Sequence, residues 1–138
     1  MHTSISGVRT LTELDHVRLA ALLRRSPPPA ARGTALVDLL DTADLVPSRQ
    51  VDPDVVTMYS QVLLADAADG SRRKLTPCYP GDAEPDAGFV SVLSPIGAAL
   101  LGSRVGDVIH WRTPSGAESS AAVVALLFQP EASGDYTL

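Results

Sequence analysis

Three closely spaced carboxylates lie in the segment GDAEPDAG, residues 81–88. Asp82, Glu84 and Asp86 alternate along it, and carboxylate oxygens are the ligands that calcium and magnesium prefer. A calcium loop of the EF-hand type, however, has about twelve residues and ends in a bidentate glutamate. Here that glutamate is missing and Pro85 breaks the spacing. We interpret the segment as a solvated acidic loop and expect no metal site.

Histidine and cysteine offer no stronger case for catalysis. His110 lies beside Trp111 in a predicted strand, and Cys78 is the single cysteine, so no intrachain disulfide is possible and a reducing compartment fits best. No histidine stands in a recognisable Ser/His/Asp arrangement, and no phosphate-binding G-x-x-x-x-G-K-[ST] loop occurs. We therefore expect no catalytic residue and no cofactor.

The basic residues do not indicate a nucleic-acid surface. The net charge is −5, and the eleven basic residues face sixteen acidic ones, whereas binding to a phosphate backbone relies on clustered lysine and arginine. Arg72, Arg73 and Lys74 form the densest basic run. It can protect an edge strand from aggregation or complement an acidic partner, and both interpretations stay open. We expect no direct binding to nucleic acid.

The length of 138 residues and the 45% hydrophobic content indicate one ordinary domain with a real core. The first residues lack the basic start and apolar run of a secretory signal. The longest apolar runs, such as residues 121–128, are far shorter than the roughly 20 residues that cross a bilayer. We expect a cytoplasmic protein with no membrane contact, and we leave its oligomeric state open.

The elements that position these residues begin with a predicted helical hairpin over residues 1–46. Thr12 can cap a first helix, which Pro27–Pro29 must end because proline lacks an N–H. A second helix stops at Pro47, and residues 47–55 are a linker. The apolar residues with helical spacing are Leu14, Val17, Ala21, Leu36, Val37, Leu40 and Ala43. Helices of this length give a hairpin only on the order of 20 Å long.

Residues 56–138 carry the pattern of a four- or five-stranded antiparallel sheet with one short helix. Asp69–Gly70 and the segment PSG at residues 114–116 are turn signals between predicted strands, and Pro77 favours an edge or a bulge. Ser94 followed by Pro95 is an ideal helix start, with a capping side chain before a proline. Gly102 marks the end of that helix. The predicted fold class is therefore α+β.

Four segments together carry a family resemblance: VVTMYSQV, YPGDAE, SVLSPIGAALLGSRVGDVIHW and QPEASGDYTL. In this order they resemble the regulator of nucleoside diphosphate kinase family, Rnk, over nearly the whole chain. The C-terminal part is also similar to the C-terminal domain of Gre-type transcript-cleavage factors. That similarity implies an FKBP-like fold for residues 56–138 and a short, coiled-coil-like hairpin before it.

The resemblance implies a non-enzymatic transcription regulator that binds RNA polymerase near its secondary channel and competes with Gre-type factors. Ser94 and Pro95 correspond to the Ser-Pro pair of the polymerase-facing loop in the cleavage factors. With Ile96 and Gly97 they are the predicted partner-binding residues.

The tip of the hairpin argues against transcript cleavage. Cleavage factors place paired acidic residues there, which help to hold a catalytic magnesium ion. This chain has no acidic residue between Asp15 and Asp38, and its tip offers Arg24, Arg25 and Arg32. Magnesium takes oxygen ligands, usually carboxylates, so the sequence predicts a regulator without cleavage activity.

Two other functions remain as alternatives. An FKBP-like fold suggests a peptidyl-prolyl isomerase, although fold alone does not confer function and the chain has only six aromatic residues. The chain can also be a general protein-interaction module that binds through a sheet edge or through its C-terminal SGDYTL tail.

Overall fold

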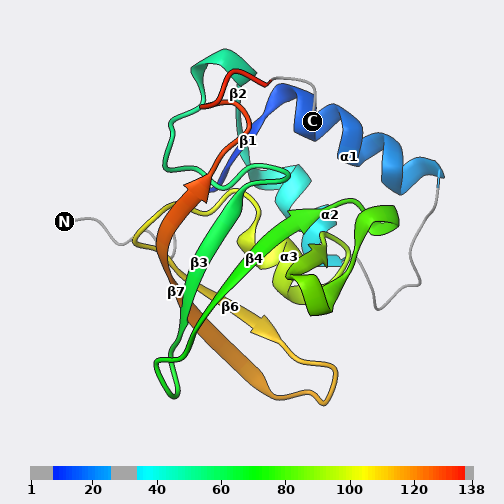
Figure 1. Cartoon of the computed structure of the whole chain (residues 1–138). Coiled ribbons are helices and arrows are strands. Elements are labelled where there is room, and N and C mark those ends of the chain that lie inside the picture. Colours follow the sequence, from blue (N-terminus) through cyan, green and yellow to red (C-terminus); the bar gives the residue numbers. More distant parts are fainter. Residues whose placement is uncertain (1–7, 26–33, 136–138) are drawn as a thin grey trace.

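The computed structural model describes residues 8–25 and 34–135, and Figure 1 shows a curled sheet with helices packed beside it. The elements in chain order are β1 (Thr10–Thr12), α1 (Glu13–Arg25), α2 (Thr34–Thr42), β2 (Asp44–Val46), β3 (Gln61–Asp66), β4 (Arg72–Cys78), β5 (Phe89–Ser91), α3 (Pro95–Leu100), β6 (Val108–Arg112) and β7 (Glu118–Phe128). Short 3₁₀ turns lie at Ser48–Gln50, Pro80–Asp82 and Pro85–Ala87. The predicted α+β class is confirmed.

The main sheet has the strand order β5-β4-β3-β7-β6. Strand β3 pairs antiparallel with both β4 and β7, and β6 pairs antiparallel with β7. The predicted turn between β3 and β4 is present: Gly70 has a φ of 73°, a conformation that glycine adopts without steric cost. The predicted loop between β6 and β7 is present as well.

The expectation of an antiparallel sheet is wrong at one edge, where β5 pairs with β4 in parallel. Parallel neighbours need a connection that carries the chain back to the start of the partner strand. Residues 79–88 do so through two 3₁₀ turns that begin at Pro80 and Pro85. Strand β5 therefore begins at Phe89, beside Thr76, and runs in the same direction as β4.

The two N-terminal helices are tied together at their base by strands that were not predicted. β1 leads directly into α1, β2 follows shortly after α2, and the two strands pair in parallel. Each strand has three residues, too few for an alternating pattern to show. The predicted cap of α1 is confirmed, since the Asp15 N–H donates to Thr12 Oγ1 at 3.0 Å.

Two apolar clusters meet at α3. The first fills the space between α3 and the sheet, with buried members Val56, Val62, Leu64, Leu75, Val90, Leu100, Ile109, Ala121 and Val123. The second joins the N-terminal helices to the rest of the chain, with buried members Leu11, Leu19, Leu36, Leu39, Met58, Val92, Ala98 and Leu101. The short helix α3 is thus packed from two sides, and this fixes its position. No helix of the described residues is long and apolar enough to span a bilayer.

Candidate docking site

The turn that opens α3 is held by the side chain of Ser94. Its Oγ accepts the Gly97 N–H at 3.2 Å, as an N-terminal cap does. The same hydroxyl donates to the Ser91 carbonyl at 2.6 Å, and the Ser94 N–H donates to that carbonyl at 2.9 Å. Pro95 follows at the first helical position. The predicted cap is confirmed, and it is braced against β5.

Gly97 is required by the close approach of α3 to β5. A Cβ at this position would lie 2.0 Å from the Ser91 carbonyl oxygen, which belongs to the backbone and cannot move aside. The turn is therefore built around a residue without a side chain. Of the other predicted docking residues, Pro95 is exposed, whereas Ile96 is half-buried against the cluster under the sheet.

Arg9 holds the opposite end of α3. Its Nη1 donates to the carbonyls of Ala98 at 2.7 Å, Ala99 at 3.2 Å and Leu101 at 3.1 Å. A cation at the C-terminal end of a helix stabilises the unpaired carbonyls there. Burial lowers the pKa of the Arg9 guanidinium. Sequence reasoning missed this residue because it lies about 90 positions from the carbonyls it binds.

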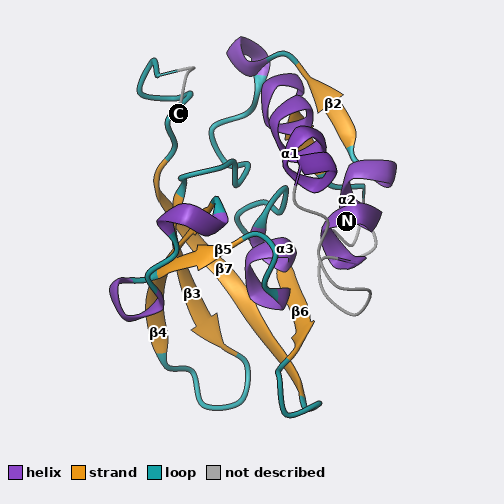
Figure 2. Ribbon diagram, turned by 90° about the vertical axis from the view of Figure 1, so that its right-hand side faces the viewer, coloured by secondary structure: helices purple, strands orange, loops and turns teal. Residues whose placement is uncertain are grey.

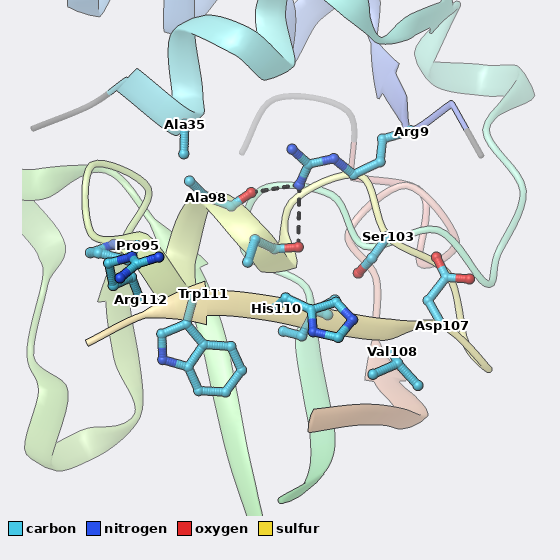
Figure 3. Close-up of a pocket in the computed structure, with 12 residues that line it drawn as sticks. Arg9, Ala35, Pro95, Ala98, Ser103, Asp107, Val108, His110, Trp111 and Arg112 are labelled. Carbon is cyan, nitrogen blue, oxygen red and sulfur yellow. Dashed lines mark hydrogen bonds between the residues drawn. The ribbon is translucent and has the colours of Figure 1, made fainter. Parts of the chain in front are cut away.

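A groove of about 440 Å³ lies between α3 and β6 (Figure 3). All five residues of β6 line it, together with Arg9, Ala35, Pro95, Ala98, Ala99, Ser103 and Asp107. Trp111 is its one aromatic residue. Because the exposed Pro95 is one of the lining residues, the predicted docking turn adjoins this groove.

The predicted basic tip is only partly described. Arg24 and Arg25 are exposed in the last turn of α1, and Arg32 lies outside the described residues. The last turn of α1, which carries Arg24 and Arg25, lies away from α3 in Figure 1. The tip and the turn are thus two separate candidate contacts.

The base of α1 carries a buried carboxylate that sequence reasoning did not single out. Asp15 is 2% exposed, and its Oδ2 accepts the Met58 N–H at 3.2 Å. Burial raises the pKa of Asp15 to about 6, and the charge of Glu131 adds to the rise, whereas the Met58 N–H and Arg18 act against it. This carboxylate ties α1 to the segment that precedes β3.

The acidic loop at residues 81–88 has a structural role, because Asp82 binds the side chain of Tyr59. Tyr59 has a φ of 66°, which is uncommon for a residue with a side chain, and its hydroxyl donates to the Asp82 carboxylate. Burial and this hydrogen bond raise the pKa of the Tyr59 phenol. No group of three or more His, Cys, Asp or Glu side chains in the described ranges is placed to hold a metal.

Comparison with known proteins places this chain in a family. The sequence model of the transcription elongation factor GreA/GreB C-terminal domain matches residues 50–127. The regulator of nucleoside diphosphate kinase of Escherichia coli (strain K12) is 40% identical over 132 residues, which cover 93% of this chain and 95% of that protein. The chain belongs to the Rnk family.

Other relatives of this Rnk-family chain are elongation factors. GreA of Geobacillus kaustophilus is 33% identical over 91 residues, which span 57% of its length. Among solved structures, a prokaryotic transcription elongation factor GreA/GreB from Nitrosomonas europaea superposes with a TM-score of 0.72 at 32% identity, covering 87% of this chain and 99% of that one. Gfh1 of Thermus thermophilus gives a TM-score of 0.50 at 27% identity. The curled sheet with few helices is therefore a GreA/GreB-like fold.

Proposed function

We propose that this Rnk-family chain is a non-enzymatic transcription regulator that binds bacterial RNA polymerase near its secondary channel and competes there with Gre-type factors. The observation that carries the proposal is the side-chain-capped turn at Ser94–Pro95, with Pro95 exposed, within the part of the chain that matches the GreA/GreB C-terminal domain. A turn that holds its shape before binding reduces the ordering cost of docking.

The proposal includes the absence of transcript cleavage. The 13 residues of α1 make a helix of only about 20 Å. Arg24 and Arg25 stand at its far end, where guanidinium groups repel a magnesium ion rather than bind it. The chain is thus suited to occupy a channel entrance without supplying a catalytic metal ligand.

The finer architecture belongs to the same proposal. We assign residues 1–46 to a short coiled-coil-like hairpin, 47–55 to a linker and 56–138 to an FKBP-like unit. The cluster that contains Leu19, Met58 and Ala98 joins the hairpin to that unit. This cluster supports a hairpin that is packed against the unit that carries the docking turn.

The alternatives receive less support. A peptidyl-prolyl isomerase is not favoured, because the relatives are named as regulators and elongation factors and the groove beside the turn contains a single aromatic residue, Trp111. A general protein-interaction module differs from our proposal in that its partner is a protein other than RNA polymerase. Under our proposal, any influence on nucleoside diphosphate kinase is indirect, through transcription.

A pull-down of purified core RNA polymerase with the tagged chain tests the proposal. We expect binding that an excess of a Gre-type factor displaces and that Pro95→Ala weakens. Pro114→Ala is the matched control, since Pro114 is an exposed proline in the β6–β7 loop, far along the chain from the turn. Absence of binding at micromolar concentrations, or binding equally sensitive to both substitutions, contradicts the proposal.

A further inference from the structure

We propose that the outer edge of β6 and the groove beside it bind an extended, acidic segment of a partner protein, with the Arg9 guanidinium pairing with a carboxylate of that segment. This goes beyond the proposed function, because it concerns the strand edge and the groove that adjoin the docking turn, and it does not depend on the polymerase being the partner. Figure 2 shows β6 at the margin of the sheet, next to α3.

The outer edge of β6 is available for strand pairing. In the described part of the chain β6 pairs with β7 and with no other strand. Alternate residues of an edge strand direct their N–H and C=O groups away from the partner strand. No backbone hydrogen bond joins Val108, His110 or Arg112 to a described segment outside the sheet. Such an edge is a template for an added strand.

Arg9 supplies a charge that the described chain does not neutralise. Its Nη1 is used by the carbonyls at the end of α3, whereas no ion pair joins Arg9 to a carboxylate within residues 8–25 and 34–135. Figure 3 shows its guanidinium over the groove, beside Ala98. A half-buried cation with donors to spare favours an anionic group, and charge-assisted hydrogen bonds are the stronger kind.

The walls of the groove fit a peptide. Five residues of β6 give an edge of roughly 17 Å at about 3.3 Å per residue. Pro95, Ala99 and Trp111 offer apolar surface to alternate side chains of an added strand. The one carboxylate in the lining, that of Asp107, is engaged by the Arg104 N–H at 2.9 Å.

A protein segment explains these features better than a nucleic acid does. Only a peptide backbone matches the alternating donors and acceptors of a strand edge. The chain also has a net charge of −5, which disfavours a polyanion. The expected ligand is therefore a short β-forming peptide with one or two carboxylates.

Fluorescence titration of Trp111, the single tryptophan of the sequence, tests this inference on the full chain. The probe is the peptide acetyl-Thr-Val-Glu-Val-Thr-amide. Two comparison peptides are the same sequence with glutamine in place of glutamate and a form of the probe with N-methylated backbone amides. We expect a saturable change with the glutamate peptide. Loss of either the carboxylate or the backbone donors should weaken binding about tenfold or more, as expected for a charge-assisted bond or a lost set of ladder bonds.

Two variants locate the site. Arg9→Gln removes the charge, and Arg73→Gln is its matched control, because it removes the same charge from the exposed part of β4. Since Arg9→Gln also loosens the end of α3, Ala35→Glu provides a second variant. Ala35 is exposed on the groove wall in the first turn of α2, where an acidic residue suits the helix. We expect both Arg9→Gln and Ala35→Glu to weaken binding of the glutamate peptide about tenfold. Arg73→Gln should leave its affinity unchanged.

Several outcomes overturn the inference. No saturable change up to millimolar peptide excludes the site, and equal affinity for the glutamate and glutamine peptides excludes the role of Arg9. Equal affinity for the N-methylated peptide excludes strand addition. Arg9-dependent binding of a single-stranded oligonucleotide, without binding of the peptide, assigns the groove to nucleic acid instead.

Discussion

The turn at the start of α3 and the far end of α1 are the two regions that we propose for contact with the polymerase, and they differ in how firmly they are held. The turn is fixed by a side-chain cap, by a glycine packed on the Ser91 carbonyl and by Arg9 at the other end of the helix. The end of α1 presents exposed arginines. A fixed backbone suits recognition of shape, whereas exposed charges suit attraction at longer range. The predictions below separate these two roles.

The largest effect is expected from Gly97→Ala. The added Cβ must displace backbone at Ser91, since only 2.0 Å separates it from the carbonyl oxygen. We expect a loss of about 3 kcal/mol in the free energy of unfolding, at the upper end for overpacking, because backbone cannot relax easily. Urea denaturation measures it. Gly81→Ala is the control, since nothing lies near its Cβ, and an equal loss there would refute the role of close packing at Gly97.

Asp15→Asn is expected to change how stability depends on pH. The folded pKa of about 6 lies above the ordinary value of 3.8, so the folded state holds this proton more tightly than the unfolded state. The contribution is fully present below pH 4 and is lost as pH rises through 6, and a shift of this size amounts to roughly 3 kcal/mol.

Unfolding measured from pH 4 to pH 7 tests this point. The wild-type chain should lose more stability across that window than Asp15→Asn does. Parallel profiles for the two proteins would contradict a buried, proton-binding Asp15 at the base of α1.

A smaller loss is expected from Ser94→Ala, which removes the cap of α3. Caps of this kind contribute about 1 kcal/mol, and the bond to the Ser91 carbonyl is lost with it. Ser94→Thr keeps a hydroxyl and should recover most of the loss in thermal denaturation. If the threonine variant is as unstable as the alanine variant, the hydroxyl is not what holds the turn.

The smallest effect on stability is expected at the other region. Replacing Arg24 and Arg25 with alanine should change the free energy of unfolding by less than about 0.5 kcal/mol, as is usual for exposed side chains. The same change should reduce the salt dependence of polymerase binding. An unchanged salt dependence would remove the tip from the proposed contact.

Sequence reasoning succeeded where structure is local. The cap at Thr12, the Ser94–Pro95 start of α3 and the Asp69–Gly70 turn each depend on neighbouring residues, so their types alone predict them. The family resemblance was also accessible, because its segments occur in order along the chain. The fold class followed from these features together.

What sequence reasoning missed depends on contacts between distant segments. The parallel pairing of β5 with β4 is set by how the loop at residues 79–88 folds back, which no periodicity reveals. Arg9 gains its role from carbonyls about 90 positions away, and Asp15 from an amide 43 positions away. A single arginine or aspartate in a sequence does not show such partners.

The most direct test of the central claim is a transcript-cleavage assay on backtracked RNA polymerase, with the RNA labelled and a Gre-type factor present or absent. We predict that the chain alone yields no cleavage product, that excess chain suppresses the cleavage caused by the Gre-type factor, and that Pro95→Ala suppresses it less than Pro114→Ala. Cleavage by the chain alone, or Gre-dependent cleavage unaffected by a large excess of it, would contradict competition at the secondary channel.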